Sequence, residues 1–287
     1  MAEQEPRTAL GIDIGGTGIK AALVDLNTGK LASERLRVGT PHPATIDAVT
    51  ETVTELVRPF LDSEPIAVGV GFPAVVRRGV ALSATNVGDD WLYADVGRVF
   101  GDAVSREVWA LNDSDAAGYA EARLGAGRHH EGTIVVVTLG TGVGTSLVVD
   151  GLLVPNIELG CLTVRGKPAG ERVANSVRKK KGVSWEQWSA DLQEFIDMLD
   201  EAVAPDLVII GGGVSKDAHR FLPAIRARPM VVPARLRNDA GIVGAATYAA
   251  AQHHLRHEQG ARTVGQLARV SEAEPAATDG QPLAPAE

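Results

Sequence analysis

Two segments of the chain repeat one order of elements: an apolar strand, a glycine turn and a second apolar strand that leads into a hairpin turn. The first copy runs from Thr8 through "GIDIGGTGIK" and the turn "NTGK" to a third strand, "LASERLRV". The second copy is "TIVVVTLGTGVGTSLVVDGLLVP", from Thr133 to Pro155, with its hairpin turn at Asp150 and Gly151. An Asx-Gly pair between apolar runs is a strong hairpin signal. The repeat predicts a duplicated lobe, in which each sheet ends in a glycine turn.

Helical periodicity follows each copy. Apolar residues recur at helical spacing from Ile46 to Phe60, behind the cap residue Thr45. Ser184 and Gln187 form a capping-box signature before "WEQWSADLQEFIDMLDEAV". The runs "PIAVGVGF" and "PDLVIIGGG" are typical of buried parallel strands. Strands that alternate with helices in two halves predict an α/β fold of two lobes with a cleft between them.

Length and composition set the expected domains. A chain of 287 residues with 45% hydrophobic residues can bury one large core or two linked ones. We expect an N-terminal lobe over residues 8–116 and a C-terminal lobe over residues 117–258. We expect residues 259–287 to be a disordered tail, because "SEAEPAATDGQPLAPAE" is rich in Pro, Ala and acids and has few apolar anchors.

The composition also argues against several classes of protein. No apolar run reaches the roughly 18 residues of a membrane helix, and "MAEQEPRTAL" lacks the pattern of a signal peptide. A formal net charge of -8 argues against nucleic-acid binding by bulk electrostatics. The single cysteine, Cys161, permits no internal disulfide and cannot form a cysteine-based metal cluster without other ligands. We therefore expect a cytoplasmic protein with neither a membrane nor a nucleic acid as partner.

The first glycine turn has the residues of a phosphate cradle, because glycine lets a phosphate approach main-chain N–H groups closely. The tip of this hairpin consists of Gly15, Gly16, Thr17 and Gly18. Asp13 ends an apolar strand, where a carboxylate is costly to bury without a partner, and it could orient Mg²⁺ or its waters. Lys20 adds positive charge. The P-loop and the dinucleotide fingerprint both fail to match this spacing, and an ordinary tight hairpin remains the alternative.

Two further glycine clusters fall at strand ends. The turn "GTGVG", which contains Thr141 and Gly142, has threonine hydroxyls on both sides. The run "GGG", centred on Gly212, ends a buried strand before a helix expected to start near Ser215, whose N-terminus would favour an anion. Each cluster could instead be an ordinary turn between elements. Three clusters at strand ends, two of them in duplicated contexts, favour a phosphate donor that spans the cleft.

Between the two copies, the strand "VWAL" ends in "NDSDAAG" and an alanine-rich helix. Asp113 has an ordinary interpretation as the N-cap of this helix. In a cleft that faces a bound hydroxyl, the same carboxylate could accept the hydroxyl proton as the oxygen attacks phosphorus. Asp115, in the first turn, is expected to complement the helix dipole.

Two loops carry polar groups that suit sugar hydroxyls. Asn156 and Glu158 stand in "NIELGC", after the second copy. Asn86 and Asp90 stand near Trp91 in "SATNVGDDW", where the indole could add an aromatic face. Solvent-facing loops are the alternative for both segments.

Taken together, "GIDIGGTGIK", "LNDSDAAG", "TLGTGVG", "PNIELG" and "IIGGGVS" resemble the ROK sugar kinases, from about Leu10 to Ala250 and in the same order. The segment "KPAGERVANSVRKKKGVSWEQW" is similar to the actinobacterial polyphosphate glucokinases within that family. The resemblance implies the actin-like ATPase (ribonuclease H-like) fold, a duplicated two-lobe α/β fold with an inter-lobe cleft. It also implies a homodimer that transfers a phosphoryl group from polyphosphate and/or ATP to the 6-hydroxyl of glucose or a related hexose, with Mg²⁺.

The resemblance also assigns roles to residues by motif match. Asp113 would be the catalytic base. The residues implied to hold sugar hydroxyls are Asn86, Asn112 and Glu158. Those implied to position the donor, together with Lys20, are Asp13, Gly15, Gly16, Thr17, Thr141, Gly142 and Gly212. Asp13 would also be the metal ligand, directly or through water.

Two positions depart from the family pattern. Cys161 stands where the Glu-x-Gly-His segment of the family has a sugar-binding histidine, and a thiol is a weak hydrogen-bond partner. Loss of one ordinary hydrogen bond costs about 0.5–1.5 kcal/mol, or roughly 2- to 13-fold in affinity. Ala74 follows Pro73, where the family usually has glycine. Two alternatives therefore stay open: a kinase for a different hexose, and a catalytically weakened paralogue that still binds sugar or polyphosphate.

A basic stretch supports polyphosphate as the donor. Its basic residues are Arg165, Lys167, Arg172, Arg178, Lys179, Lys180 and Lys181, against one acid, Glu171. Clustered positive charge raises the local concentration of a polyanion in a salt-dependent way. A solvated helix end is the alternative.

Overall fold

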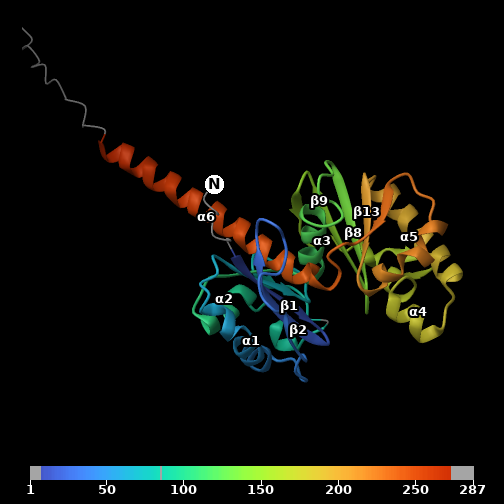
Figure 1. Ribbon diagram of the computed structural model, residues 1–287, viewed down its shortest axis with the longest axis horizontal. Coiled ribbons are helices and arrows are strands. Elements are labelled where there is room, and N and C mark those ends of the chain that lie inside the picture. The colour runs from blue at the N-terminus through green and yellow to red at the C-terminus, as the bar shows by residue number, and fades with distance from the viewer. Residues whose placement is uncertain (1–7, 85, 273–287) are drawn as a thin grey trace, which may run out of the picture. The chain divides into compact units, whose positions relative to one another are not determined.

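The computed structural model describes residues 8–84 and 86–272. It contains two five-stranded sheets with the same internal order (Figure 1). The first sheet has the order β3-β2-β1-β4-β7 and consists of β1 (Thr8–Gly15), β2 (Gly18–Asp25), β3 (Leu36–Val38), β4 (Val68–Phe72) and β7 (Val108–Asn112). The second has the order β10-β9-β8-β13-β14 and consists of β8 (Thr133–Leu139), β9 (Val143–Val149), β10 (Leu152–Val154), β13 (Leu207–Gly211) and β14 (Met230–Pro233).

The two sheets are built in the same way. In the first, β1 pairs antiparallel with β2 and parallel with β4, and β4 pairs parallel with β7. In the second, β8 pairs antiparallel with β9 and parallel with β13, and β13 pairs parallel with β14. The predicted duplicated α/β fold is therefore confirmed, and each glycine turn joins the two antiparallel strands of its sheet.

Six α-helices and several short elements connect the strands within the described residues. The helices are α1 (Ile46–Leu61), α2 (Val96–Val104), α3 (Asp113–Arg123), α4 (Asn175–Lys181), α5 (Trp185–Val203) and α6 (Ala240–Glu272). The short strands are β5 (Val76–Arg77), β6 (Val80–Ala81), β11 (Thr163–Val164) and β12 (Lys167–Pro168). The 3₁₀ helices are η1 (Asp89–Trp91), η2 (Leu159–Cys161), η3 (Ala169–Glu171), η4 (Gly213–Arg220), η5 (Leu222–Ala224) and η6 (Arg237–Asp239).

Two predicted helix starts agree with the structure, and the helix predicted near Ser215 does not. The Thr45 hydroxyl accepts a hydrogen bond from Ala48 N at the start of α1, and the Ser184 hydroxyl accepts one from Gln187 N at the start of α5. Both predicted caps are confirmed. The helix predicted near Ser215 is instead the 3₁₀ helix η4, which starts directly after the glycine turn.

The predicted third strand, "LASERLRV", is shorter than expected. Leu31 makes an isolated bridge to Val24, and continuous pairing begins at Leu36. Between them, the Ser33 hydroxyl takes the hydrogen bond of Leu23 N at 3.0 Å. A side-chain oxygen thus replaces a main-chain partner and interrupts the ladder, which is how serine competes with regular structure.

The helices divide the two sheets into outer and inner faces. Helices α1 and α2 cover the outer face of the first sheet, where Val53 and Phe100 pack with Ile12 in one buried cluster. Helix α5 covers the outer face of the second sheet, where Phe195 packs with Val137. The inner faces meet α3 and the start of α6, both visible beside the sheets in Figure 1. Burial of each large apolar side chain stabilises the fold by about 1.5–3 kcal/mol.

Helix α3 contacts both sheets. Its Ala120 lies in a cluster with residues of β1, β2 and α6, and its Ala122 lies in a cluster with residues of β8 and β13. The start of α6 packs closely on the first sheet, because a Cβ atom on Gly11 would collide with the main chain at Ile242. This contact places residues 240–250 against the first sheet, although the sequence assigned residues 117–258 to the C-terminal lobe.

The chain divides into two compact units, one ending at Ala250 and the other starting at Ala251. The lobe boundaries at residues 116 and 258 stay a prediction. Of the tail expected at residues 259–287, the part up to Glu272 belongs to α6, and residues 273–287 lie outside the described residues. No helix in the described part of the chain is long and apolar enough to cross a membrane.

Candidate active site

The first sheet presents an ion pair next to its glycine turn. Asp13 of β1 lies opposite Lys20 of β2, and the Lys20 Nζ atom is 2.6 Å from Asp13 Oδ2. Gly11 and Asp13 point to the same face, because side chains alternate along a strand. Asp13 also lies against the first turn of α6, since a Cβ atom on Gly241 would be 2.7 Å from its carboxyl carbon. The carboxylate therefore faces a lysine and a helix N-terminus, both of which favour negative charge.

Asp113 is the first residue of α3, and Asn112, not Asp113, is the helix N-cap. The Asn112 Oδ1 atom accepts hydrogen bonds from Ser114 N at 2.9 Å and Asp115 N at 3.0 Å. The ordinary interpretation of Asp113 as the cap is therefore wrong. The carboxylate of Asp113 accepts the Ser114 N–H at 2.8 Å through Oδ1.

The surroundings of Asp113 suit a base. Burial raises the pKa of Asp113 to about 7, and the negative charges of Asp13 and, to a smaller extent, Glu158 add to the rise. Hydrogen bonds from Ser114 act in the opposite direction. A carboxyl group with a pKa near 7 can accept a proton from a hydroxyl at neutral pH.

One cavity of about 210 Å³ joins these groups. Asp13, Lys20, Asp113 and Gly212 all line it. The rest of its wall consists of Ser114, Ala117, Glu121, Val136, Thr138, Gly211, Ala234, Arg237, Asn238, Ala240 and Gly241. The structure therefore brings together the predicted base, the predicted metal ligand, the lysine and one predicted donor glycine around a single opening.

Gly212 has a backbone that requires glycine. Its φ is +76°, and a Cβ atom there would be 2.5 Å from the main-chain oxygen of Leu139. The turn after β13 thus passes very close to the end of β8. This close passage brings the third glycine cluster next to the second sheet's hairpin turn.

The other predicted donor residues lie at the two hairpin tips and do not line this cavity: Gly15, Gly16, Thr17, Thr141 and Gly142. The second tip is held by the first turn of α4, because Ser176 N donates to Gly140 O at 3.0 Å and Ser176 Oγ donates to Thr141 O at 2.6 Å. The first tip is exposed at Gly16 and Thr17. Their contact with a donor stays a prediction.

The predicted acceptor residues differ in how available they are. Glu158 is exposed at the N-terminal end of η2, and Cys161 is exposed at its other end. Asn86 is exposed in a turn. Asn112 is 9% exposed, and its Nδ2 atom donates to Ala74 O at 2.9 Å in addition to the cap bonds of Oδ1. A sugar contact by Asn112 stays a prediction, and it would use the hydrogen-bonding capacity that these bonds leave.

Two groups of the Asn86 loop are structural. Trp91 is fully buried in the core of the first sheet, and its Nε1 atom donates to Ala44 O at 3.1 Å. Asp90 accepts the Ile46 N–H at 2.7 Å. The predicted aromatic face for a sugar is therefore wrong, because "DDW" folds into a 3₁₀ turn that buries the indole against Phe72 and Phe100.

Asp115 also has a more specific environment than the predicted helix-dipole role. It is 1% exposed, and its Oδ2 atom accepts the Asn156 N–H at 2.7 Å. Burial raises the pKa of Asp115 to about 7, with smaller contributions from Glu158 and Asp113, while the bond from Asn156 lowers it.

Glu121 is a residue of the site that the sequence interpretation missed. It is 1% exposed and lines the cavity two turns after Asp113 on α3. Its carboxylate accepts the main-chain N–H groups of Leu236 at 2.6 Å, Ala126 at 2.9 Å and Arg235 at 3.0 Å. These bonds hold the segment that carries Arg237 and Asn238 to the cavity. The available signal was an acid inside the alanine- and glycine-rich stretch "AAGYAEARLGAG".

The basic stretch divides into paired and exposed cations. Arg165 Nε lies 2.7 Å from Glu194 Oε2, and its guanidinium lies 3.4 Å from Asp191. Arg172 lies 3.8 Å from Asp191, and Arg178 stacks over the ring of Trp185 at 3.7 Å. The exposed members are Lys167, Lys179, Lys180 and Lys181. The acids that pair with the stretch come from α5, so the local count of one acid underestimated its neutralisation.

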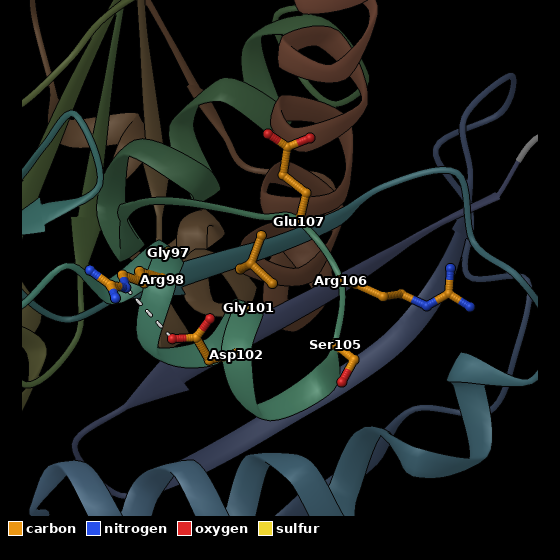
Figure 2. A pocket seen from close by; sticks show the side chains of 8 residues that line it. Gly97, Arg98, Gly101, Asp102, Ser105, Arg106 and Glu107 are labelled. Atoms are coloured by element: carbon orange, nitrogen blue, oxygen red, sulfur yellow. Dashed lines mark ion pairs between the residues drawn. The ribbon is translucent and has the colours of Figure 1, made fainter.

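A larger hollow of about 590 Å³ lies in the first half of the chain, away from the predicted residues (Figure 2). Its lining consists of Gly97, Arg98, Gly101, Asp102, Ser105, Arg106, Glu107 and Val108. Arg98 and Asp102 form an exposed pair at 3.6 Å. In Figure 2 the Arg106 and Glu107 side chains point away from this pair. The hollow brings together none of the candidate phosphate or sugar groups.

Comparison with known proteins agrees with this geometry. The ROK family matches residues 9–155. A polyphosphate glucokinase of Mycobacterium tuberculosis is 43% identical over 241 residues, which cover 84% of this chain and 90% of the relative. That of Mycobacterium leprae is 44% identical over 237 residues, which cover 82% of this chain and 72% of the relative. The crystal structure of an inorganic polyphosphate/ATP-glucomannokinase from Arthrobacter sp. strain KM matches with a TM-score of 0.80 and 46% identity, covering 86% of this chain and 99% of that one.

Proposed function

Because the chain belongs to the ROK family, we propose that it is a kinase that transfers a phosphoryl group from polyphosphate or ATP to the 6-hydroxyl of glucose. The observation that carries the proposal is the cavity in which Asp113 faces Asp13 and Lys20. The names of the mycobacterial and Arthrobacter relatives support both the donors and the acceptor.

Asp113 is the base of the proposed reaction. As the 6-hydroxyl oxygen forms its bond to the terminal phosphorus, the bond from that phosphorus to the rest of the donor breaks, and Asp113 accepts the hydroxyl proton. Burial, with a smaller contribution from the charges of Asp13 and Glu158, raises the pKa of Asp113 to about 7, high enough for the group to hold the proton it receives. The transfer is direct and needs no covalent intermediate on the protein.

The positive groups of the cavity bind the donor. Lys20 reaches the cavity from β2, and the first turn of α6 presents its N-terminal end beside Asp13. Both favour the negative charge of a phosphate. The exposed Lys179, Lys180 and Lys181, on α4, extend positive charge from the second hairpin tip, which Ser176 holds.

The donor set also fits Mg²⁺ in the role predicted from the sequence. No cluster of three or more His, Cys, Asp or Glu side chains suited to a metal occurs in the described ranges 8–84 and 86–272. Mg²⁺ is commonly held by one or two carboxylates, waters and substrate phosphates, so a full protein cage is not required. Asp13 is a carboxylate in the phosphate-facing cavity and would hold the ion directly or through water. The ion would offset the charge of the donor phosphates.

Purified protein tests the proposal directly. Glucose, Mg²⁺ and either polyphosphate or ATP are supplied across a range of ionic strength, and glucose 6-phosphate is measured. We expect product from at least one donor. We expect turnover with polyphosphate to fall more steeply with salt than turnover with ATP, because exposed lysines attract a long polyanion. Absence of product from both donors would refute the proposal.

Cys161 bears on which sugar is the acceptor. The Arthrobacter relative is named a glucomannokinase, so mannose and amino sugars belong in the panel beside glucose. Equal or better turnover of another hexose would make that sugar the principal substrate. Replacement of Cys161 by histidine should lower the KM for glucose by roughly 2- to 13-fold if an imidazole restores one hydrogen bond. A large gain in kcat would instead indicate a catalytically weakened paralogue.

Two further properties belong to the proposal through the family resemblance. A homodimer is expected, and sedimentation equilibrium of the purified chain tests it. A cytoplasmic location is the other expectation, which fractionation of cells that express the protein would test.

A further inference from the structure

Asp115 is a buried carboxylate that the reaction described above does not use. It is 1% exposed in the first turn of α3, two residues after Asp113. Its Oδ2 atom accepts the Asn156 N–H at 2.7 Å, and its Oδ1 atom is buried without a hydrogen-bond partner. Burial of a carboxylate is costly, so the bond that it makes to Asn156 is an important part of its compensation.

Asn156 in turn connects the two halves of the chain. Its φ is +61°, in the left-handed region that asparagine tolerates better than most residues. Its side-chain amide pairs with both main-chain groups of Val76, because Val76 N donates to Oδ1 at 2.9 Å and Nδ2 donates to Val76 O at 2.8 Å. The amide thus closes the segment after β10 onto strand β5.

The two segments joined in this way carry the proposed acceptor groups. Glu158 lies two residues after Asn156, and its charge reaches Asp113, since it contributes to the raised pKa of that carboxyl. The β5 segment follows Ala74, whose main-chain oxygen accepts the Asn112 Nδ2 bond, and it leads toward Asn86. The first turn of α3 therefore holds one segment through Asn112 and the other through Asp115.

We propose that Asp115 is a positioning residue of the acceptor side, which holds Asn156 so that Asn156 fixes the Val76 and Glu158 segments around Asp113. The proposal rests on the proposed function, because it assigns these segments to the sugar. It also gives α3 two separate positioning roles. Asp115 positions the acceptor side, whereas Glu121, which holds the Arg235 and Leu236 main chain, positions the donor side.

The groups around Asp115 agree with a role in which the shape of its side chain matters as much as its charge. The titratable groups that act on it or respond to it are Asp113 on α3, Glu158 at η2 and Tyr248 on α6. Together with burial, the two acids raise the pKa of Asp115 to about 7. An asparagine at this position keeps a side-chain oxygen for the Asn156 N–H without the cost of a buried charge.

Steady-state kinetics of Asp115→Ala and Asn156→Ala test the proposal. We expect each variant to raise the KM for glucose roughly tenfold, with the donor KM changed by less than about twofold. Asp115→Ala loses the charge-assisted bond from the Asn156 N–H, and Asn156→Ala keeps that N–H but loses the two side-chain bonds to Val76. We expect the double variant to be no worse than the more affected single variant, because the two substitutions break successive links of one series of contacts, from Asp115 through Asn156 to Val76. Asp115→Asn should stay within about threefold of the wild type.

Asp206→Ala is the matched control. Asp206 accepts the Thr133 N–H at 2.7 Å, so it makes a bond of the same donor and acceptor types at the same distance, although Asp206 is exposed and Asp115 is buried. This bond lies at the end of β8 remote from the glycine turn. Its loss should lower the thermal midpoint without changing either KM. A general loss of stability is thereby separated from a loss of acceptor positioning.

The outcomes of the proposed function and of this inference are distinct. Turnover by the wild-type protein tests the proposed function. If the wild type is active, the inference is overturned when Asp115→Ala and Asn156→Ala raise the KM for glucose and the KM for the donor equally. It is also overturned when the two variants change only the thermal midpoint. If Asp115→Ala does not fold, Asn156→Ala decides alone: a tenfold rise in the glucose KM supports the inference, and an unchanged KM overturns it.

Discussion

The two sheets have the same strand order, yet they present different chemistry at the same place. Near the glycine turn of the first sheet, Asp13 and Lys20 form an ion pair across β1 and β2. At the corresponding place in the second sheet, Thr138 of β8 lies opposite Gly144 of β9. Duplication therefore supplied two sheets with the same strand order, and the charged strand residues that line the cavity, Asp13 and Lys20, come from the first sheet.

The second sheet uses the same place to accommodate α3. A Cβ atom on Gly144 would collide with the side chain of Ser114, next to Asp113. The Thr138 hydroxyl lies 3.5 Å from Ser114 Oγ. The absence of a side chain at residue 144 thus allows the start of α3 to pack against β9. In the proposed reaction, the first sheet would contribute charge for the donor, and the second sheet would contribute the surface that places the base.

The largest expected difference between the two sheets is in catalysis. Asp13→Asn should lower kcat/KM by roughly 10²–10³, because it removes the proposed Mg²⁺ ligand while keeping the side-chain shape. Thr138→Val should lower it by less than about tenfold, since it removes at most one neutral hydrogen bond. Kinetics of the two variants with the same donor measure the difference. Equal losses of kcat/KM would mean that the two sheets contribute equally to catalysis.

The second expected effect is on pH dependence. The base must be ionised, so kcat/KM should fall by about tenfold for each pH unit below the pKa of Asp113, which burial raises to about 7. The effect on stability has the opposite sign. The folded state binds more protons than the unfolded chain between about pH 4, the ordinary pKa, and pH 7, so stability should decrease as pH rises through this range.

Asp113→Asn checks both signs. In this variant the thermal midpoint should depend less on pH between 4 and 7 than it does in the wild type. A pH–rate profile and melting curves over the same range supply the data. A wild-type rate that stays flat from pH 5 to pH 8 would contradict the assignment of the base.

The third expected effect concerns the glycine turns. Gly212→Ala should destabilise the fold by about 2 kcal/mol or more, because φ is +76° and the new Cβ atom meets Leu139 O. Gly16→Ala should change stability by less than about 0.5 kcal/mol, since a Cβ atom there meets nothing within 4 Å. Urea unfolding of both variants measures the comparison. A stable Gly212→Ala protein would show that this turn can move away from β8.

The smallest expected effect concerns the basic stretch. Substitution of Lys179, Lys180 and Lys181 by glutamine should raise the KM for polyphosphate several-fold at low salt and little at high salt, with the KM for ATP unchanged. Arg165→Gln should change it by less than about twofold, because Glu194 and Asp191 already pair with this guanidinium. A larger rise in the polyphosphate KM from Arg165→Gln than from the triple lysine variant would contradict the division into paired and exposed cations.

Much of the frame was predictable because local patterns determine it. The repeated strand, glycine turn and strand order predicted the two sheets, and the caps at Thr45 and Ser184 predicted two helix starts. The joint placement of Asp13, Lys20, Asp113 and Gly212 around one cavity agrees with their position at strand ends. The sheet order and the caps depend on residues close together in the sequence, whereas the cavity joins residues that are distant in sequence but share a position near strand ends.

The rest could not be predicted because it depends on contacts between distant segments. Trp91 was interpreted as an exposed aromatic face, yet it packs in the core between Phe72 and Phe100. The neutralisation of Arg165 comes from acids on α5, and the bond of Asp115 to Asn156 joins residues on opposite sides of β8 and β9 in the sequence. Glu121 likewise finds its partners at residues 235 and 236. Periodicity and motif spacing contain no information about such pairs.

Turnover of the Asp113→Asn protein tests the central claim most directly. The carboxamide keeps the shape of the side chain and cannot take the hydroxyl proton, so kcat with saturating glucose and either donor should fall by roughly 10²–10⁴ while both substrates still bind. A variant that forms glucose 6-phosphate at the wild-type rate would show that the carboxylate at the start of α3 is not the base.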